Sequence, residues 1–414
     1  MRRILPAIRR TPRGQILVGD EPMVFHCNHY NHWLQRIVTL SPDPAIEGSI
    51  SDAAEACAYA MVTAAASELR FTRSDEKLAL ASSLFAELGF GTMDFASVGP
   101  NGGVVRTPTS HYGQLLLGPA GVDRFHRPTA HLDRGFAAGA AAAAFDLELG
   151  ALSSTTEACH SVGAPMGLIR LGRAEPIRKL SPSPGNGTPV TVEPPPPNAL
   201  TNVDEPEILR ALSSLELSGN EEGFILRFGV SLTLNFASFY NRMTFEFLRR
   251  KSAGEERLAA ELFVDAGHRC AFNTFGGIMT SPEWDAIVRP MCKTREDWVH
   301  GMVAVTNALG WGTWRVHELE PDRAVFRIYD DYESRGYLSH YGASLRPVSF
   351  LAEGGCAGLM NLVFAGAIET RPTLDSKYYA RVFESDESFR TTQSKSLAAG
   401  DPYTEVLVER GSAS

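Results

Sequence analysis

Short motifs in the first half of this 414-residue chain return, in the same order, in the second half. The pairs are Tyr30-Asn31 with Tyr240-Asn241, Cys57-Ala58-Tyr59 with Cys270-Ala271-Phe272, Leu88-Gly89-Phe90 with Leu309-Gly310-Trp311, His111-Tyr112-Gly113 with His340-Tyr341-Gly342, and Gly163-Ala164-Pro165 with Gly400-Asp401-Pro402. The separation between partners rises steadily along the chain. Chance matches would scatter, so this ordered drift indicates a tandem duplication with small insertions. We therefore predict two copies of one fold.

A stretch rich in Pro, Gly and Ser separates the two copies. Its composition cannot bury apolar surface and favours extended structure. We predict repeat 1 at residues 1–175, a linker at 176–207 and repeat 2 at 208–414. The linker is long enough for the repeats to pack face to face as an internal pseudo-dimer.

Each copy has the same predicted order of elements, which is typical of an α+β domain with helices packed on a small antiparallel sheet. In the first copy we expect helices at 25–40, 52–69, 76–88 and 128–147, and strands at 92–98, 103–107 and twice within 152–171. In the second copy we expect helices at 232–250, 257–275, 295–309 and 345–364, and strands at 313–319, 323–329 and twice within 378–408. Asp330, Asp331 and Glu333 are interpreted as a solvated acidic loop.

The composition limits the classes of partner. A net charge of −9 argues against nucleic acid, which requires a basic face. No apolar run reaches membrane-spanning length, and no apolar segment typical of a signal peptide follows the first residues. The six cysteines contain no CxxC pair, which is typical of free thiols in the cytoplasm, the expected location. The sequence has no nucleotide-cofactor motif and leaves open whether two chains form a homodimer.

The end of each copy carries a recognisable pattern. Residues 157–169 contain Cys159 before a Gly-Ala-Pro turn and a strand, and residues 393–406 contain a Gly-Asp-Pro turn before a strand. Cys356 precedes small residues on a predicted helix. These features resemble the 4-vinyl-reductase-like domain, which shares the ligand-binding fold of TRAPP-type and phenol-sensing modules. The resemblance implies a small-molecule pocket between helices and sheet.

The family's zinc-binding cysteines are largely missing here. Gly167 stands at the second cysteine position of the first copy, and Ser396 and Thr404 stand at both positions of the second. A tetrahedral zinc site needs four ligands, most of its affinity coming from thiolates. We therefore expect no zinc site of the family type.

A cluster of polar residues distinguishes the first copy. His26, Cys27 and His29 precede Tyr30-Asn31, whereas alignment on Tyr-Asn places Phe236, Ala237 and Phe239 at these positions in the second copy. Buried imidazoles and thiols cost free energy unless they are paired, so the cluster needs a reason. The second copy instead has an aromatic set that includes Phe245, interpreted as packing material or as the wall of a shared pocket.

Three interpretations of the cluster remain open. In the first, His26 and His29 share a helix face and bind zinc or iron with Cys27, and His111, His126, His131 or a carboxylate completes the shell. In the second, Cys27 is a thiolate nucleophile, activated by a helix N-terminus and an imidazole from His26 or His29. In the third, the residues only satisfy backbone groups at an interface. Cys57 and Cys270 are interpreted as core residues.

We expect a protein of specialised metabolism that binds and transforms a small, partly apolar or aromatic molecule. The predicted catalytic or metal-binding residues are Cys27, His26 and His29, and the predicted ligand contacts are Tyr30, Asn31 and His111. The first alternative is a non-catalytic sensor or carrier that acts with a separate partner. The second is a TRAPP-like interaction protein.

Overall fold

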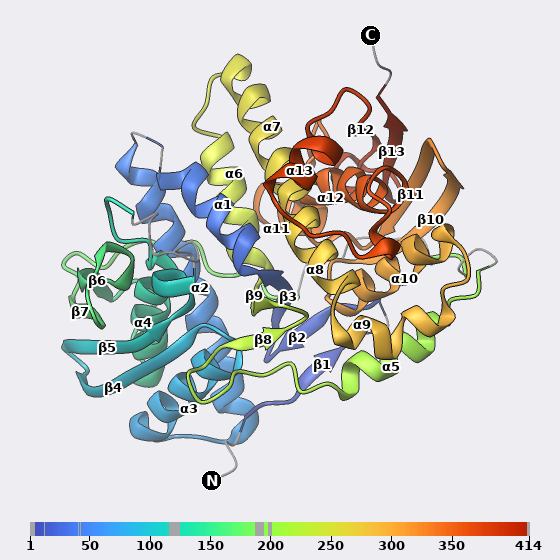
Figure 1. Ribbon diagram of the computed structural model, residues 1–414. Coiled ribbons are helices and arrows are strands. Elements are labelled where there is room, and N and C mark those ends of the chain that lie inside the picture. The colour runs from blue at the N-terminus through green and yellow to red at the C-terminus, as the bar shows by residue number, and fades with distance from the viewer. Residues whose placement is uncertain are drawn as a thin grey trace.

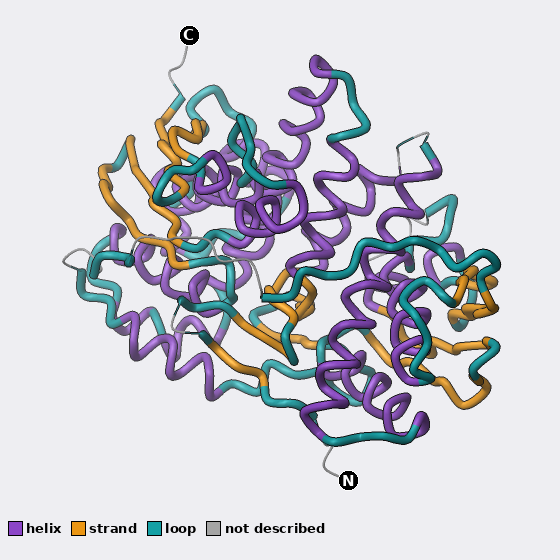
Figure 2. The backbone as a smooth tube through the Cα atoms, turned by 180° about the vertical axis from the view of Figure 1, so that it is seen from behind, coloured by secondary structure: helices purple, strands orange, loops and turns teal. Residues whose placement is uncertain are grey.

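The structure is a computed structural model that describes residues 5–11, 13–39, 41, 43–115, 125–186, 194–197 and 201–411. It is an α+β protein in which helices pack against small antiparallel sheets (Figure 1). Seen from behind, the strands form two outer groups with a third group between them (Figure 2). Within the described ranges, no helix is both long and apolar enough to cross a bilayer.

Two four-stranded sheets form the outer groups. One has the order β4 (Gly91–Gly99), β5 (Gly102–Ser110), β7 (Gly167–Arg173), β6 (Leu152–Ala158). The other has the order β10 (Thr313–Glu320), β11 (Arg323–Tyr329), β13 (Thr404–Arg410), β12 (Phe389–Lys395). All neighbours are antiparallel. The strands of each sheet come from one half of the chain, and they follow the same order.

A close helix pair lies beside each outer sheet: α2 (Pro44–Leu69) with α4 (His131–Ala144), and α7 (Ala253–Cys270) with α12 (Phe350–Met360). Helices α4 and α12 pack on the strands, and α2 and α7 pack on these helices. Glycine is required where the backbones meet. A Cβ on Gly139 would lie 2.1 Å from the Glu55 carbonyl oxygen, and one on Gly354 would lie 2.0 Å from that of Val264. The Ala- and Gly-rich helix of the first half thus packs tightly and is buried along most of its length.

Some helices begin with ordinary capping residues. Asp43 caps α2 ahead of a proline, and Thr294 with Asp297 forms a capping box on α10 (Arg295–Ala308). The remaining helical segments are α1 (Asn28–Thr39), α3 (Ser74–Glu87), α5 (Glu205–Ser214), α6 (Ala237–Leu248), α8 (Gly276–Met279), α9 (Pro282–Ile287), α11 (Tyr332–Tyr341) and α13 (Ser376–Phe383), with the short turns η1 (His111–Leu115), η2 (His160–Val162), η3 (Ala271–Phe275), η4 (Arg289–Met291), η5 (Asn361–Ala365), η6 (Ile368–Thr370) and η7 (Leu397–Ala399).

The central sheet contains strands from both halves of the chain. Its order is β1 (Ile8–Arg10), β2 (Ile16–Val18), β3 (Glu21–Cys27), β9 (Val230–Phe236), β8 (Ile225–Arg227). The two halves meet where β3 pairs antiparallel with β9, Val24 lying opposite Asn235. Figure 1 shows these strands between the two outer units.

The halves also exchange backbone hydrogen bonds reciprocally. The Phe25 N–H donates to the Leu309 carbonyl oxygen over 2.9 Å, and the Leu234 N–H donates to the Leu88 carbonyl oxygen over 2.9 Å. Helix α1, which follows β3, packs on α7 of the second half, and α6, which follows β9, packs on α2 of the first half. Each half therefore contributes a strand and a helix to the other's packing.

The predicted helices at 25–40 and 232–250 were wrong at their starts. Residues up to Cys27 belong to β3, and residues up to Phe236 belong to β9. Both strands are buried on both faces, so their side chains show no polar–apolar alternation that would distinguish them from a buried helix. Strands β3 and β9 were missed for this reason.

The acidic loop is also not solvated. Asp331 accepts hydrogen bonds from the hydroxyls of Ser349 and Thr404, and all three side chains are buried. The Glu333 carboxylate accepts from the backbone N–H groups of Leu351 and Ala352, both over 3.1 Å. Glu333 therefore satisfies N–H groups in the first turn of α12 that a capping residue would otherwise take.

The predicted linker lies partly outside the described residues. Its described parts, 176–186, 194–197 and 201–207, contain no helix or strand before α5, which begins at Glu205, inside the predicted linker. Arg178 forms ion pairs with Asp52 and Glu55 of α2, at 2.7 and 2.6 Å. The Arg315 side chain of the second half donates to the Pro196 carbonyl oxygen. The division into two repeats and a linker stays a prediction.

The indole of Trp311 provides a test of the junction between the halves. Its Nε1–H donates to the Phe25 carbonyl oxygen over 2.8 Å, whereas the Nε1 of the equally buried Trp314 has no partner. Both Trp→Phe substitutions remove similar volume, but only Trp311→Phe leaves a buried carbonyl unpaired. We expect Trp311→Phe to lower the free energy of unfolding by about 1–3 kcal/mol more than Trp314→Phe does, measured by urea denaturation. Equal losses would contradict this role.

Candidate functional site

The six predicted site residues lie at the junction between the halves. His26 and Cys27 are the last two residues of β3, whereas His29, Tyr30 and Asn31 lie in the first turn of α1. The expectation that His26 and His29 share a helix face is therefore wrong, because the helix begins between them. His111 starts η1, directly after β5.

The His26 imidazole lies among aromatic rings from both halves. The ring centroids of Tyr30 and Tyr240 are 4.6 and 4.4 Å away, and those of Trp311 and Tyr332 are 5.1 and 5.6 Å away. Its Nε2 hydrogen-bonds the Tyr332 hydroxyl over 3.1 Å, and its Nδ1 has no partner. Burial lowers the pKa of His26 well below its usual value, so the ring is neutral.

The structure gives His26 a polar counterpart in the second half. Strands β3 and β9 have equal length, and each runs directly into a helix of equal length, so His26 corresponds to Asn235. The Asn235 amide donates to the Tyr112 hydroxyl over 2.7 Å, as His26 bonds Tyr332. The alignment on Tyr-Asn placed Phe236 opposite His26 and was out by one residue. Both contacts join one half to the other, which supports a structural role for His26.

Asn31 and His111 belong to a second network across the junction. The Asn31 amide nitrogen lies 3.0 Å from His111 Nε2 and 3.3 Å from Thr233 Oγ1, and its oxygen accepts from the Tyr240 hydroxyl over 2.7 Å. Since the amide nitrogen can only donate, Nε2 of His111 is the acceptor and the ring proton is assigned to Nδ1. Burial lowers the pKa of His111 to about 3.

Cys27 lies at the N-terminus of α1. Its Sγ accepts from the Tyr30 N–H over 3.3 Å and from the Thr274 hydroxyl over 2.6 Å, and it lies 3.8 Å from the Sγ of Cys270. Burial alone would raise the pKa of Cys27, but the Cys270 thiol, the His29 imidazole and the Thr274 hydroxyl outweigh burial and hold this pKa well below its usual value. The helix N-terminus and the imidazole predicted from the sequence are thus both beside this thiol.

The predicted metal shell is not assembled in the described parts of the chain. There, no three His, Cys, Asp or Glu side chains are grouped as a metal ion would require. His26 binds Tyr332, and burial lowers the pKa of His131 to about 3. In the family-like tails, Cys159 contacts the Ser161 hydroxyl and Thr404 donates to Asp331.

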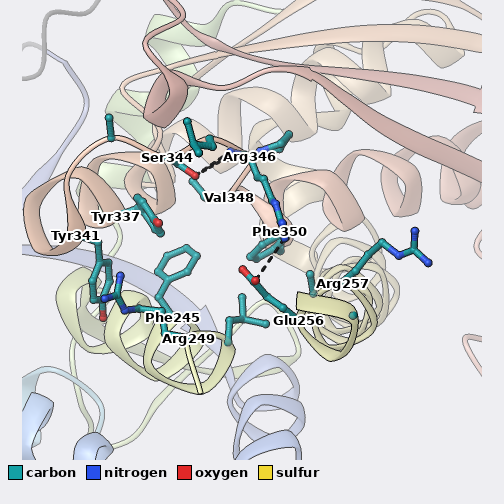
Figure 3. A pocket seen from close by; sticks show the side chains of 16 residues that line it. Phe245, Arg249, Glu256, Arg257, Tyr337, Tyr341, Ser344, Arg346, Val348 and Phe350 are labelled. Atoms are coloured by element: carbon teal, nitrogen blue, oxygen red, sulfur yellow. Dashed lines mark hydrogen bonds and ion pairs between the residues drawn. The ribbon is translucent and has the colours of Figure 1, made fainter. Parts of the chain in front are cut away.

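An open cavity of about 1010 Å³ lies in the second half, between α6, α7, α11 and the loop that leads to α12. Four aromatic side chains form its apolar wall: Phe245, Tyr337, Tyr341 and Phe350 (Figure 3). The Phe245 ring meets that of Tyr337 edge-on, with centroids 4.8 Å apart. None of the six predicted site residues lines this cavity.

The rim of the cavity carries more positive than negative charge. Its charged lining residues are Arg249, Arg257, Arg346 and Glu256. Arg346 pairs with Glu256 at 3.4 Å, and the Arg249 guanidinium lies 4.9 Å from the centre of the Tyr341 ring. Arg249 and Arg257 therefore account for the excess positive charge of the rim.

Sequence reasoning did not place this cavity. Phe245 belonged to the aromatic set interpreted as packing or as a pocket wall, and it is the member that lines the space. The spacing of Tyr337 and Tyr341, one helical turn apart, was an available signal. This spacing alone does not predict a cavity, because the cavity also requires α6 and α7 to lie opposite α11.

No family model matches the chain, and no curated protein matches it. Among solved structures, the chain is similar to the phenol-responsive sensory domain of the transcription activator PoxR, determined with phenol. The identity is 15% and the TM-score 0.35, over 49% of this chain and 89% of that chain.

The buried His111 predicts a specific dependence of stability on pH. Its pKa is about 3 in the folded protein against 6.5 for the free side chain, so below pH 6.5 only the unfolded state takes up its proton. Because of His111, the free energy of unfolding should fall by about 1.4 kcal/mol for each pH unit as the pH drops below 6.5. The free energy of unfolding of the wild type should fall faster between pH 7 and about 5 than that of His111→Gln. Parallel curves in urea denaturation would contradict this.

Proposed function

We propose that this protein binds a small, partly aromatic molecule with an anionic group in the cavity of its second half, and that it acts as a sensor or carrier with a separate partner. The observation that carries the proposal is the lining of that cavity. Aromatic rings on three sides offer stacking and edge contacts to a planar ligand, and the surplus arginines favour a negative charge. Its volume is in the range of small-molecule sites.

The proposal includes the architecture predicted from the sequence. Two modules that resemble the 4-vinyl-reductase-like domain, at 1–175 and 208–414, would form an internal pseudo-dimer around the central sheet. The equal strand order of the outer sheets and the reciprocal hydrogen bonds of Phe25 and Leu234 support it. In this arrangement one half carries the ligand site.

Catalysis by Cys27 is less well supported than binding. The Cys27 side chain is completely buried and contributes nothing to the described cavity wall, so a substrate in that cavity does not meet it. His26 and His111 are neutral and engaged with residues of the opposite half or of α1. A catalytic role would require that Cys27→Ala abolish turnover while the fold stays intact.

Removing one ring from the cavity should weaken binding. We expect Tyr337→Ala to raise the dissociation constant of a bound aromatic ligand about fivefold, the loss of roughly 1 kcal/mol from one aromatic contact. Tyr379→Ala is the matched control, since Tyr379 is another half-buried tyrosine of the second half that lies outside the cavity. Titration calorimetry with 2-naphthoate compares the variants. An equal effect of both substitutions would refute the cavity as the site.

The rim charge predicts which ligands bind best. Benzoate and 2-naphthoate should bind more tightly than benzyl alcohol and 2-naphthalenemethanol, which have the same rings without the charge. Arg249→Gln should reduce this preference by about 1 kcal/mol or less, because the rim is open to solvent. Equal affinity for acids and alcohols in the wild type would contradict the anionic ligand class and leave a neutral aromatic molecule as the ligand.

A further inference from the structure

Two cysteines that are 243 positions apart in the chain meet at the junction of the halves. Cys27 ends β3 of the first half, and Cys270 ends α7 of the second. Their Sγ atoms are 3.8 Å apart, which is van der Waals contact, and both thiols are free and fully buried. Forming a bond of about 2 Å from this contact requires a small movement of two side chains.

The two sulfur atoms have different neighbours. Cys27 accepts from the Tyr30 N–H and from the Thr274 hydroxyl, and the His29 imidazole lies beside it. Donors of this kind stabilise a thiolate, the reactive form of cysteine. Cys270 has Cys27 and Thr274 as neighbours, and burial raises its pKa. Cys27 is therefore arranged to react first, and Cys270 second.

We propose that Cys27 and Cys270 form a reversible disulfide that ties the two halves together, with a hydroperoxide as the oxidant. The Cys27 thiolate attacks one peroxide oxygen, the O–O bond breaks, and a sulfenic acid forms. The hydroxide that leaves takes up the proton released by the Cys27 thiol and becomes water. The Cys270 thiol then attacks the Cys27 sulfur, the S–OH bond breaks, and water leaves. In sum, two thiols and one hydrogen peroxide give one disulfide and two waters, and a small peroxide reaches the buried pair through local opening.

Cys57 provides an internal comparison. It corresponds to Cys270 in the repeated motifs and is equally buried, but within the described ranges its side chain meets the Ser183 hydroxyl, 4.0 Å away, and not a second thiol. Burial raises the pKa of Cys57. The two halves thus place similar cysteines on similar helices, and in only one of these two positions does a second thiol face the first.

The test uses the wild-type protein and hydrogen peroxide. After treatment, the protein is denatured in the presence of a thiol-alkylating reagent that blocks the free thiols. It is then digested with trypsin and analysed by mass spectrometry. We expect the number of free thiols to fall by two from six, and a peptide containing Cys27 to be joined to one containing Cys270. Dithiothreitol should restore both. Trypsin leaves Cys270 and Cys292 in one peptide, because Pro290 follows Arg289, so the assignment is repeated in Cys292→Ser.

Variants separate this pair from other thiols. Cys27→Ser and Cys270→Ser should each abolish the linked peptide, and Cys57→Ser should leave it unchanged. In Cys270→Ser the sulfenic acid at Cys27 should persist and be trapped by dimedone. The proposal is overturned if the oxidised wild type shows Cys27 and Cys270 both alkylated, if Cys27 is converted to sulfinic acid without a linked peptide, or if either cysteine pairs with a different residue.

Discussion

The antiparallel pairing of β3 with β9 is the constraint on which the rest of this structure depends. It sets the first half of the chain beside the second in one register, with Phe25 opposite Leu234. The N–H of each residue donates a hydrogen bond to a carbonyl oxygen at the end of a helix in the opposite half, that of Leu309 for Phe25 and that of Leu88 for Leu234. Because α1 and α6 follow these strands directly, the same pairing places α1 against α7 of the second half and α6 against α2 of the first half.

This pairing also explains most of the polar cluster that distinguishes the first half. His26 and Asn235 occupy equivalent places, and each bonds a tyrosine of the opposite half. Asn31 connects His111 with Tyr240, again across the junction. Buried polar groups of this kind are costly unless paired, and when paired they specify one arrangement of the halves. Cys27 is different, since its neighbours are a second thiol, a hydroxyl and a helix N-terminus.

The open cavity and the buried cluster are therefore separate features. The cavity is made from helices that pack within the second half, and the arginines on its rim face solvent on an accessible side. The cluster lies between the halves and is enclosed. The proposed ligand binding concerns the first feature, and the proposed disulfide concerns the second.

The sequence alone determined the α+β class and most strands of the outer sheets, because hydrophobic periods and Gly turns are local signals. The hairpin of β10 and β11 and the helices α3 and α10 fell close to their predicted ranges. It also identified His26, Cys27 and His29 as a cluster that distinguishes the first copy. The immediate neighbours of Cys27 along the chain supply the helix N-terminus and His29.

Only the tertiary structure decided what depends on contacts between distant segments. Strands β3 and β9 were hidden because they are buried on both faces and so show no alternation. Cys27 contacts Cys270 because segments more than a hundred residues apart pack together. Asp331 and Glu333 are buried hydrogen-bond acceptors because two successive helices pack against each other. The cavity arose from the facing of α6, α7 and α11. Periodicity reports which side of an element is buried, but the partner that buries it is set by the fold.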